Sequence, residues 1–371
     1  MKKVIQFIYG KSVYTTGMQQ ELEQCPEFNT MFENGCIDLE EIMHNFGKES
    51  GMGDYSALNS LSKLFYWIRM NRYLSLHYGH LKYSVADIQY VSVLYVMLIP
   101  FLTRTFDRIV LSFWGSDLLR QNRRILSLVK LLIKRADIIT FPTPDMADSF
   151  RQKVGTGYND KIRIVRFGNY FLDRIDNSTN SAAEEFVRKY RIDRNRTVVV
   201  IGYNRFRQQQ HLETINSIIG SKIERDKIFI VIPWTYGPED DNYKKQIENT
   251  IEGRYDFVFI TEHMSDDELV ALRRITDVLI SVLTTDALNA TMLETMYSGG
   301  EVITGSWLKY DFLYDNGIVM RRVGNTEEVG SELVRSIKTP LSQEVRDNNR
   351  RVIDNLYRWK SIISEWVALY S

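Results

Sequence analysis

The chain has 371 residues, of which 44% are hydrophobic and 25% are charged, a balance typical of globular proteins and sufficient for two α/β domains. Its 47 basic and 47 acidic side chains give a formal net charge of +0, which argues against a nucleic-acid partner. Cys25 and Cys36 lack CxxC spacing and a neighbouring histidine cluster, which excludes a structural zinc site.

The first half of the chain alternates short apolar runs with helical patterns, which predicts a parallel sheet with helices on both faces. Strands are expected at residues 4–9, 87–93, 108–113, 137–141 and 161–166, and helices from about Thr15, at 118–135 and at 144–153. The longest apolar run, residues 91–102, is too short to span a bilayer and is predicted to be a buried strand leading into a helix. The opening strand does not resemble a signal peptide, so a cytoplasmic protein is expected.

A polar segment at residues 173–181 predicts the boundary between two domains. The second half then begins again with apolar runs that predict strands at 197–202, 228–233, 257–260, 278–283 and 302–304. We therefore expect an α/β protein with a doubly wound, Rossmann-like domain at 1–175, a second at 176–345, and a cleft between them. A C-terminal helix at 346–371 is expected to pack back on the first domain.

Residues 284–303, TTDALNATMLETMYSGGEVI, predict a polar loop after a strand, then a helix and another strand. The helix would begin near Asn289, where unpaired backbone N–H groups and a partial positive charge favour a phosphate. Thr285 and Asp286 lie in the loop, and Glu294 lies a turn or more into the helix, where a carboxylate can accept hydrogen bonds from ribose hydroxyls. An ordinary loop followed by a buried helix is the alternative.

A second polar loop, residues 202–211, follows the first strand of the second half. Gly202 opens this loop and His211 closes it, while Arg205 and Arg207 supply forked donors that suit a diphosphate. A solvated loop is the alternative for the two arginines. Tyr236 lies in another turn after a strand, where it would either wall the nucleotide base or sugar or belong to a plain turn.

In the first half, residues 112–117, SFWGSD, end a predicted strand. Asp117 is a candidate general base for an acceptor hydroxyl, and it is equally a candidate N-cap of the next helix. His77 and His80 have no evident third ligand, so we predict no metal site there.

Three segments, 114–117, 202–211 and 286–300, resemble the motifs of GT-B glycosyltransferases of the group 1, or family 4-like, class. Asp286 stands where that class usually has Glu, Glu301 where it has Pro, and its usual Lys is absent from the loop after Gly202. His211 is similar to a residue of bacterial aminofucosyl (Fuc4NAc) transferases. The resemblance leaves open whether the sugar's configuration is retained or inverted.

The resemblance implies a GT-B fold, a nucleotide-diphosphate sugar bound by the second half, and a glycan or lipid-linked acceptor bound by the first. It implies that Asp117 and Asp286 are catalytic. It implies that the donor is bound by the other candidate residues: Gly202, Arg205, Arg207, His211, Tyr236, Thr285, Asn289 and Glu294. It further implies no metal cofactor, and a role in bacterial surface polysaccharide synthesis such as capsule or O-antigen. A nucleotide-sugar 2-epimerase of the same fold and a non-catalytic glycan- or partner-binding module remain the alternatives.

The segment 118–135, LLRQNRRILSLVKLLIKR, combines helical apolar spacing with many basic residues. Such a helix either lies on an anionic membrane surface or packs its leucines on the sheet and leaves its basic face in water.

Overall fold

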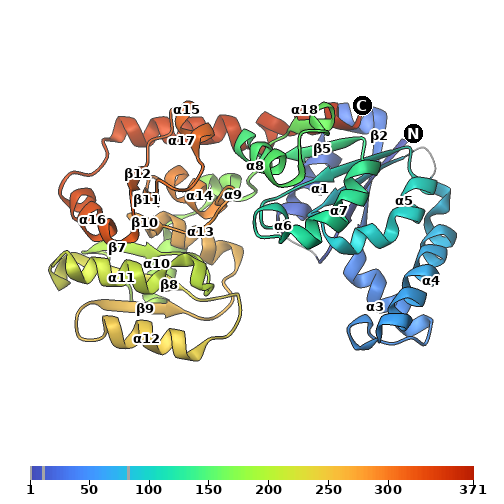
Figure 1. Ribbon diagram of the computed structural model, residues 1–371. Helices are drawn as coiled ribbons and strands as arrows, with labels where there is room; N and C mark the ends of the chain where they lie inside the picture. The colour runs from blue at the N-terminus through green and yellow to red at the C-terminus, as the bar shows by residue number, and fades with distance from the viewer. Residues whose placement is uncertain (1, 11–12, 82–83) are drawn as a thin grey trace. The chain divides into compact units, whose positions relative to one another are not determined.

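The computed structural model describes residues 2–10, 13–81 and 84–371, which form two compact units (Figure 1). Unit 1 contains Met1–Gly168 and Trp359–Ser371, and unit 2 contains Asn169–Arg358. The boundary predicted at 173–181 is wrong, because α9 (Phe171–Asn177) is a helix whose apolar side chains are buried in the core of unit 2. The chain returns to unit 1 at Trp359, later than the predicted 345/346 boundary.

The sheet of unit 1 has six strands in the order β2-β1-β3-β4-β5-β6, and neighbouring strands run parallel. Its strands are β1 (Lys2–Ile8), β2 (Phe32–Asp38), β3 (Val85–Gln89), β4 (Arg108–Ser112), β5 (Ile138–Phe141) and β6 (Ile162–Ile164). Its α-helices are α1 (Val13–Gln24), α2 (Pro26–Met31), α3 (Leu39–Glu49), α4 (Ser60–Tyr78), α5 (Ile99–Thr105), α6 (Ser116–Leu119), α7 (Arg123–Arg135), α8 (Pro144–Val154) and α18 (Trp359–Tyr370). The 3₁₀ turns are η1 (Tyr55–Ala57), η2 (Gly79–Leu81), η3 (Val93–Leu98) and η4 (Asn159–Lys161).

Two elements of unit 1 differ from the sequence prediction. The apolar run 91–102 contains no strand, because β3 ends at Gln89 and the run continues as η3 and then α5, with Pro100 in the first turn of α5. The single helix expected at 118–135 is two helices, because the Asn122 side chain caps α7 by accepting a hydrogen bond from the Ile125 N–H.

The last helix of the chain packs into unit 1. Trp359, Ile362 and Trp366 join a core cluster with residues of β1 and α1. The Tyr370 hydroxyl donates to Asp87 Oδ2 at 2.5 Å, in the middle of the sheet. Asp87 also accepts from Ser112 Oγ at 2.8 Å, and burial raises the pKa of its carboxyl to about 6. These contacts make α18 part of the core of unit 1.

The sheet of unit 2 also has six parallel strands, in the order β12-β11-β10-β7-β8-β9. Its strands are β7 (Thr197–Ile201), β8 (Ile228–Pro233), β9 (Asp256–Ile260), β10 (Val278–Ser281), β11 (Glu301–Gly305) and β12 (Arg321–Val323). Its other α-helices are α10 (Asn180–Tyr190), α11 (His211–Gly220), α12 (Asp241–Ile251), α13 (Asp266–Ile275), α14 (Ala290–Tyr297), α15 (Asp311–Asp315), α16 (Val329–Lys338) and α17 (Gln343–Tyr357), with 3₁₀ turns η5 (Arg207–Gln209), η6 (Arg225–Lys227) and η7 (Thr326–Glu328).

Side-chain alternation along β7 builds the two cores of unit 2. Val199 and Ile201 join a cluster with α11, α12 and α16, whereas Val198 and Val200 join a cluster with α9, α10, α13, α14 and α17. Successive side chains of a strand point to opposite faces, so these helices cover both faces of the sheet.

The strand order places a topological switch point beside β7. From β7 the chain winds outward to β8 and β9, and then crosses back to β10 and winds the other way. The loops that follow β7 and β10 therefore leave the same edge of the sheet in opposite directions. In open parallel sheets, ligands bind in the crevice that forms at such a point.

No helix in the part of the chain that the structure describes is both long enough and apolar enough to cross a bilayer.

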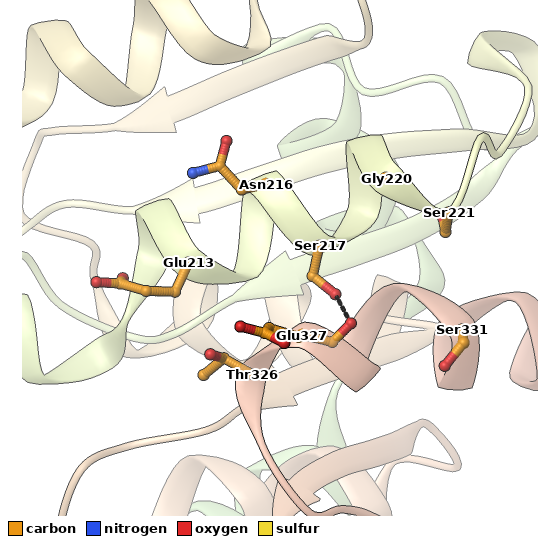
Figure 2. A pocket seen from close by; sticks show the side chains of 8 residues that line it. All are labelled: Glu213, Asn216, Ser217, Gly220, Ser221, Thr326, Glu327 and Ser331. Carbon is orange, nitrogen blue, oxygen red and sulfur yellow. Dashed lines mark hydrogen bonds between the residues drawn. The ribbon is translucent and has the colours of Figure 1, made fainter.

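Helices α11 and α16 approach each other closely beside a shallow pocket (Figure 2). Ser217 Oγ donates to the Glu327 carbonyl oxygen at 2.6 Å, and the Gly330 N–H donates to Ser217 Oγ at 2.9 Å. A Cβ at Gly330 would lie 2.1 Å from the Ser217 carbonyl oxygen, so the contact requires glycine. Gly220, at the end of α11, has nothing within 4 Å of an added Cβ.

We expect Gly330→Ala to lower the free energy of unfolding by roughly 1–3 kcal/mol, because the new methyl group forces two helix backbones apart. The matched variant Gly220→Ala should be neutral or stabilising by up to about 1 kcal/mol, because alanine favours a helix over glycine. Urea denaturation of both variants measures the difference. Equal stability of the two variants would contradict the close packing of α11 on α16.

Candidate functional site

The two polar segments singled out in the second half lie side by side at the switch point of unit 2. The Gly202 N–H donates to the Ile280 carbonyl at 3.0 Å, and the Thr284 N–H donates to the Gln208 carbonyl at 3.1 Å. The Gln210 side chain also donates to the Val282 carbonyl. The structure thus brings residues 202–210 and 282–289 together, although about 80 residues separate them in the chain.

Gly202 permits a close approach beneath the first of these loops. Its φ of +66° is readily adopted only by glycine. An added Cβ would lie 3.0 Å from Gln209 Oε1 and 3.1 Å from His211 Nε2. Both of these atoms are buried and lack a hydrogen-bond partner among the described residues. Gly202 therefore acts as a spacer over two inward-facing polar side chains.

His211 is fully buried, so it does not stand at the surface of the loop as a phosphate contact would. Burial lowers the pKa of its imidazole to about 3, opposed only weakly by the backbone of Asn204. The ring is therefore neutral at physiological pH. It packs 5.2 Å from the Trp234 ring and 6.0 Å from the Tyr243 ring, between centroids. The sequence-based assignment of His211 to donor contact is not supported by this position.

Asn204 organises the loop, a role that the sequence analysis missed. Its Oδ1 accepts from the Phe206 N–H at 3.0 Å and from Gln209 Nε2 at 3.1 Å. Its Nδ2 donates to the hydroxyl of Tyr236 at 3.1 Å, and the Tyr236 side chain is exposed. An Asn two residues before the bonded N–H is the signal of an Asx-turn, which was available in the sequence.

Arg205 and Arg207 both belong to the loop, but each already has protein partners. Arg205 Nε donates to the Gly237 carbonyl at 2.5 Å. Arg207 Nε and Nη2 donate to Asp240 Oδ2 at 2.9 and 2.7 Å, and its guanidinium lies 4.4 Å from the centroid of the Tyr243 ring. The Arg207 side chain is 62% exposed, so its ion pair contributes little to stability.

The amino end of α11 has no side-chain cap. Its N-cap residue, Gln210, is in the left-handed region with a φ of +54° and makes no side-chain capping bond. Tyr243 of α12 is buried, and burial raises the pKa of its hydroxyl.

The loop after β10 contains both exposed and engaged residues. Thr285 is exposed. Asp286 is half-buried, and its Oδ2 accepts from the Tyr310 hydroxyl at 2.6 Å. Burial and the charge of Asp286 raise the pKa of that hydroxyl well above its usual range. Asn289 is buried and is the N-cap of α14, because its Oδ1 accepts from the Met292 N–H and its Nδ2 donates to Ser281 Oγ at 2.9 Å. Asn289 is therefore a capping residue.

Glu294 forms a buried ion pair. Its Oε2 accepts from Arg273 Nε at 2.9 Å and its Oε1 accepts from Asn169 Nδ2 at 3.2 Å. Arg273 also donates to Thr291 Oγ1 at 3.0 Å. The side chains of Arg273 and Glu294 are 7% and 4% exposed. Both carboxylate oxygens thus have protein partners, which the sequence analysis did not identify because they lie far away along the chain.

Asp117 lies in unit 1, whereas the other predicted site residues lie in unit 2. It is 1% exposed, and its carboxylate accepts from the backbone N–H groups of Val91 at 2.9 Å, Trp114 at 3.0 Å and Gly115 at 2.8 Å. The N-cap of α6 is Gly115. The N-cap role considered for Asp117 is therefore corrected: its carboxylate joins the loops after β3 and β4. Its role as a general base stays a prediction.

Tyr90 follows β3 beside Asp117 and has an unusual backbone. Its φ of +66° lies in the left-handed region, which is strained for an aromatic residue. Its N–H donates to the Ser112 carbonyl at 3.1 Å, and its hydroxyl lies 3.0 Å from Ser116 Oγ. The side chain remains 39% exposed. Strained, exposed residues of this kind concentrate at binding sites.

The pocket of Figure 2 lies elsewhere, on the side of unit 2 between α11 and η7–α16. None of the site residues predicted from the sequence lines it. Its lining consists mainly of small and acidic residues: Glu213, Asn216, Ser217, Gly220, Ser221, Thr326, Glu327 and Ser331. Within residues 2–10, 13–81 and 84–371, no group of three His, Cys, Asp or Glu side chains is placed to hold a metal ion.

Several solved structures share the fold over the whole length of the chain. A glycosyltransferase from Rickettsia africae ESF-5 matches with a TM-score of 0.73 at 12% identity, covering 100% of this chain and 97% of that chain. HepE from Anabaena, in complex with UDP and glucose, matches with a TM-score of 0.73 at 12% identity and covers 100% of both chains. Sucrose-phosphate synthase from Thermosynechococcus elongatus matches with a TM-score of 0.70 at 11% identity, covering 100% of this chain and 98% of that chain.

No protein-family model matches the sequence, and no curated protein matches it. The structural likeness at this low identity establishes the fold, an α/β architecture of two Rossmann-like units.

The titration of Asp117 predicts a pH dependence of stability. Burial raises the pKa of its carboxyl from 3.8 to about 6, so between these values the folded chain holds a proton that the unfolded chain has lost. The free energy of unfolding should therefore fall as pH rises through this window. Asp117→Asn removes this titration, so the total decrease in the free energy of unfolding across the window should be smaller by roughly 3 kcal/mol. Urea denaturation at several pH values measures the slope, and an unchanged slope would contradict the assignment.

The buried pair predicts a second result. Glu294→Ala should destabilise the chain by roughly 3–5 kcal/mol, because it leaves the Arg273 guanidinium buried without its partner. The double variant Arg273→Met with Glu294→Leu should lose much less, because it removes both charges and keeps the volume. Thermal and urea unfolding compare the two proteins. A single variant as stable as the double variant would show that the charges are not buried together.

Proposed function

We propose that this chain, which has the GT-B fold, is a glycosyltransferase that uses a nucleotide-diphosphate sugar. In this proposal unit 2 binds the donor and unit 1 binds a glycan or lipid-linked acceptor. The supporting observation is the meeting of the loops 202–210 and 282–289 at the switch point of unit 2, where parallel sheets bind ligands. HepE, one of the structures that share the fold, was solved in complex with UDP and glucose.

The loop after β7 supplies the cations for the donor diphosphate in this proposal. The exposed Arg207 exchanges the Asp240 carboxylate for a phosphate, and Arg205 lies two residues away in the same loop. Arginine forks match phosphate oxygens, and their positive charge stabilises the diphosphate as it leaves the sugar. No metal is required by this arrangement.

The remaining exposed side chains at this edge suit the rest of the donor. Tyr236 offers an aromatic wall for the base or sugar, and its hydroxyl is held by Asn204. Thr285 and Asp286 offer a hydroxyl and a carboxylate to sugar hydroxyl groups, with Asp286 oriented by Tyr310. We retain Glu294 as the candidate for the ribose hydroxyls, with its carboxylate oriented by Arg273 and Asn169. Catalysis would consist of positioning and charge stabilisation.

A non-catalytic, GT-B-type binding module is the second candidate, and one observation favours it. The carboxylates of Asp117 and Glu294 are buried and hydrogen-bonded within the protein, and Asp286 is bonded to Tyr310. A 2-epimerase would need no acceptor for turnover. The role in bacterial surface polysaccharide synthesis, in the cytoplasm, belongs to the proposal as well and follows from the resemblance of the sequence motifs.

Calorimetric titration with UDP-, GDP- and dTDP-sugars, followed by assays with and without glycan acceptors, tests the proposal. We expect one class of nucleotide sugar to bind, and its sugar to be transferred only when an acceptor is present. Turnover without acceptor would identify an epimerase. Binding without any turnover would favour the binding module, and the absence of nucleotide binding would refute the donor site.

The double variant Arg205→Ala with Arg207→Ala should weaken nucleotide-sugar binding at least about tenfold, because two charge-assisted contacts are lost. The transfer rate should fall further, by roughly 2–4 kcal/mol in barrier height. Arg335→Ala with Arg351→Ala, two exposed arginines of α16 and α17, is the matched control and should behave as wild type. Equal affinities of the two double variants would remove the loop from donor binding.

A further inference from the structure

Helix α4 of unit 1 is apolar on two opposite faces. One face is buried and contains Tyr66, Trp67, Met70 and Leu74. Tyr66 and Trp67 contact the aromatic rings of Phe46 in α3 and Tyr55 in η1 at centroid distances of 5.0 to 5.5 Å. A helix with apolar residues on all its faces is normally buried on all of them. The second apolar face of α4 therefore requires an explanation.

The second face is an exposed apolar stripe. Leu61, Leu64, Phe65 and Ile68 follow the i, i+3, i+4, i+7 spacing of one helix face, and Leu76 continues that face two turns later. These five side chains are between 51% and 74% exposed. The four most exposed large apolar side chains in the described part of the chain all belong to this stripe. Contiguous exposed apolar surface of this kind marks an interaction site.

The charge around the stripe is positive. Arg69 and Arg72 are exposed on the same side of α4, and the helix contains no acidic residue from Ser60 to Tyr78. Two guanidinium groups thus lie on the exposed side of α4 together with the stripe.

We propose that the α4 stripe docks unit 1 on an anionic lipid bilayer surface, with the helix lying in the interface. Leucine, phenylalanine and isoleucine side chains would enter the acyl boundary, and Arg69 and Arg72 would reach lipid phosphates. Helices α3 and α4 project beyond the sheet of unit 1, so the stripe is presented at an extremity of that unit (Figure 1). This inference is independent of the donor site in unit 2.

A lipid contact at residues 118–135 was one of two alternatives from the sequence, and the stripe on α4 offers more exposed apolar surface for such a contact. Helix α7 buries Leu126, Val129, Leu132 and Ile133, and of its large apolar residues only Leu128 and Leu131 are exposed. Its basic residues therefore lie on a face with little apolar surface to insert. Helix α7 is accordingly the internal control for α4.

Co-sedimentation with vesicles of phosphatidylcholine, with or without one third phosphatidylglycerol, tests the proposal on the full chain. We expect wild type to bind the anionic vesicles, and Leu64→Gln with Phe65→Gln and Ile68→Gln to reduce this binding at least about tenfold. Arg69→Gln with Arg72→Gln should reduce it by roughly tenfold or more and remove its salt sensitivity. Leu128→Gln with Leu131→Gln, on α7, should bind as wild type.

These variants change exposed side chains, so circular dichroism and thermal unfolding should match those of wild type. Failure of wild type to bind anionic vesicles would overturn the proposal, as would undiminished binding by the α4 triple variant. Sedimentation velocity without lipid tests whether a second copy of the chain occupies the stripe instead. Self-association of wild type that the triple variant loses, with no vesicle binding, would assign the stripe to a second copy of the chain and reject the lipid surface.

Discussion

Parallel strand pairing is the constraint on which both units depend. It places the carboxyl ends of neighbouring strands at one edge of each sheet, where the chain must leave in polar loops. In unit 2 the pairing of β7 with β10 brings the loop that begins at Gly202 beside the loop that contains Thr284, across a long stretch of sequence. In unit 1 the pairing of β3 with β4 places Tyr90 beside the loop that contains Asp117. Strand order, more than any single residue, therefore determines where ligands can be held.

Buried carboxylates join separate elements within each unit. Asp87, Asp117 and Glu294 are each at most 3% exposed, and each accepts at least two hydrogen bonds or an ion pair. Burying a charge is costly unless hydrogen-bond donors compensate for its lost hydration, so each of these acids is buried beside its donors. The exposed side chains at the edge of unit 2, such as Arg207 and Thr285, are different residues. Residues that hold the site and residues available to a ligand are thus largely separate.

The sequence allowed the parallel α/β architecture and most strands to be predicted, because runs such as Val198 to Ile201 have no alternative to burial. The edge strands β2 and β12 were missed, since their partly exposed, polar residues resemble loops. The two polar segments that meet at the switch point of unit 2 were singled out from residue types and spacing. The burial of Asp117 and the partners of Glu294 could not be identified from the sequence, because they depend on backbone N–H groups and side chains that only folding brings near.

The placement of α18 has a consequence for biosynthesis. Unit 2 is formed by one uninterrupted stretch, Asn169–Arg358, so it can fold on the ribosome as soon as that stretch has emerged. Unit 1 begins first but lacks Trp366 and Tyr370 until translation has passed all of unit 2. Until then Asp87 lacks its hydrogen bond from the Tyr370 hydroxyl, and the apolar surface that α18 covers in unit 1 is exposed. The N-terminal unit, although its synthesis begins first, is therefore the last to complete its core.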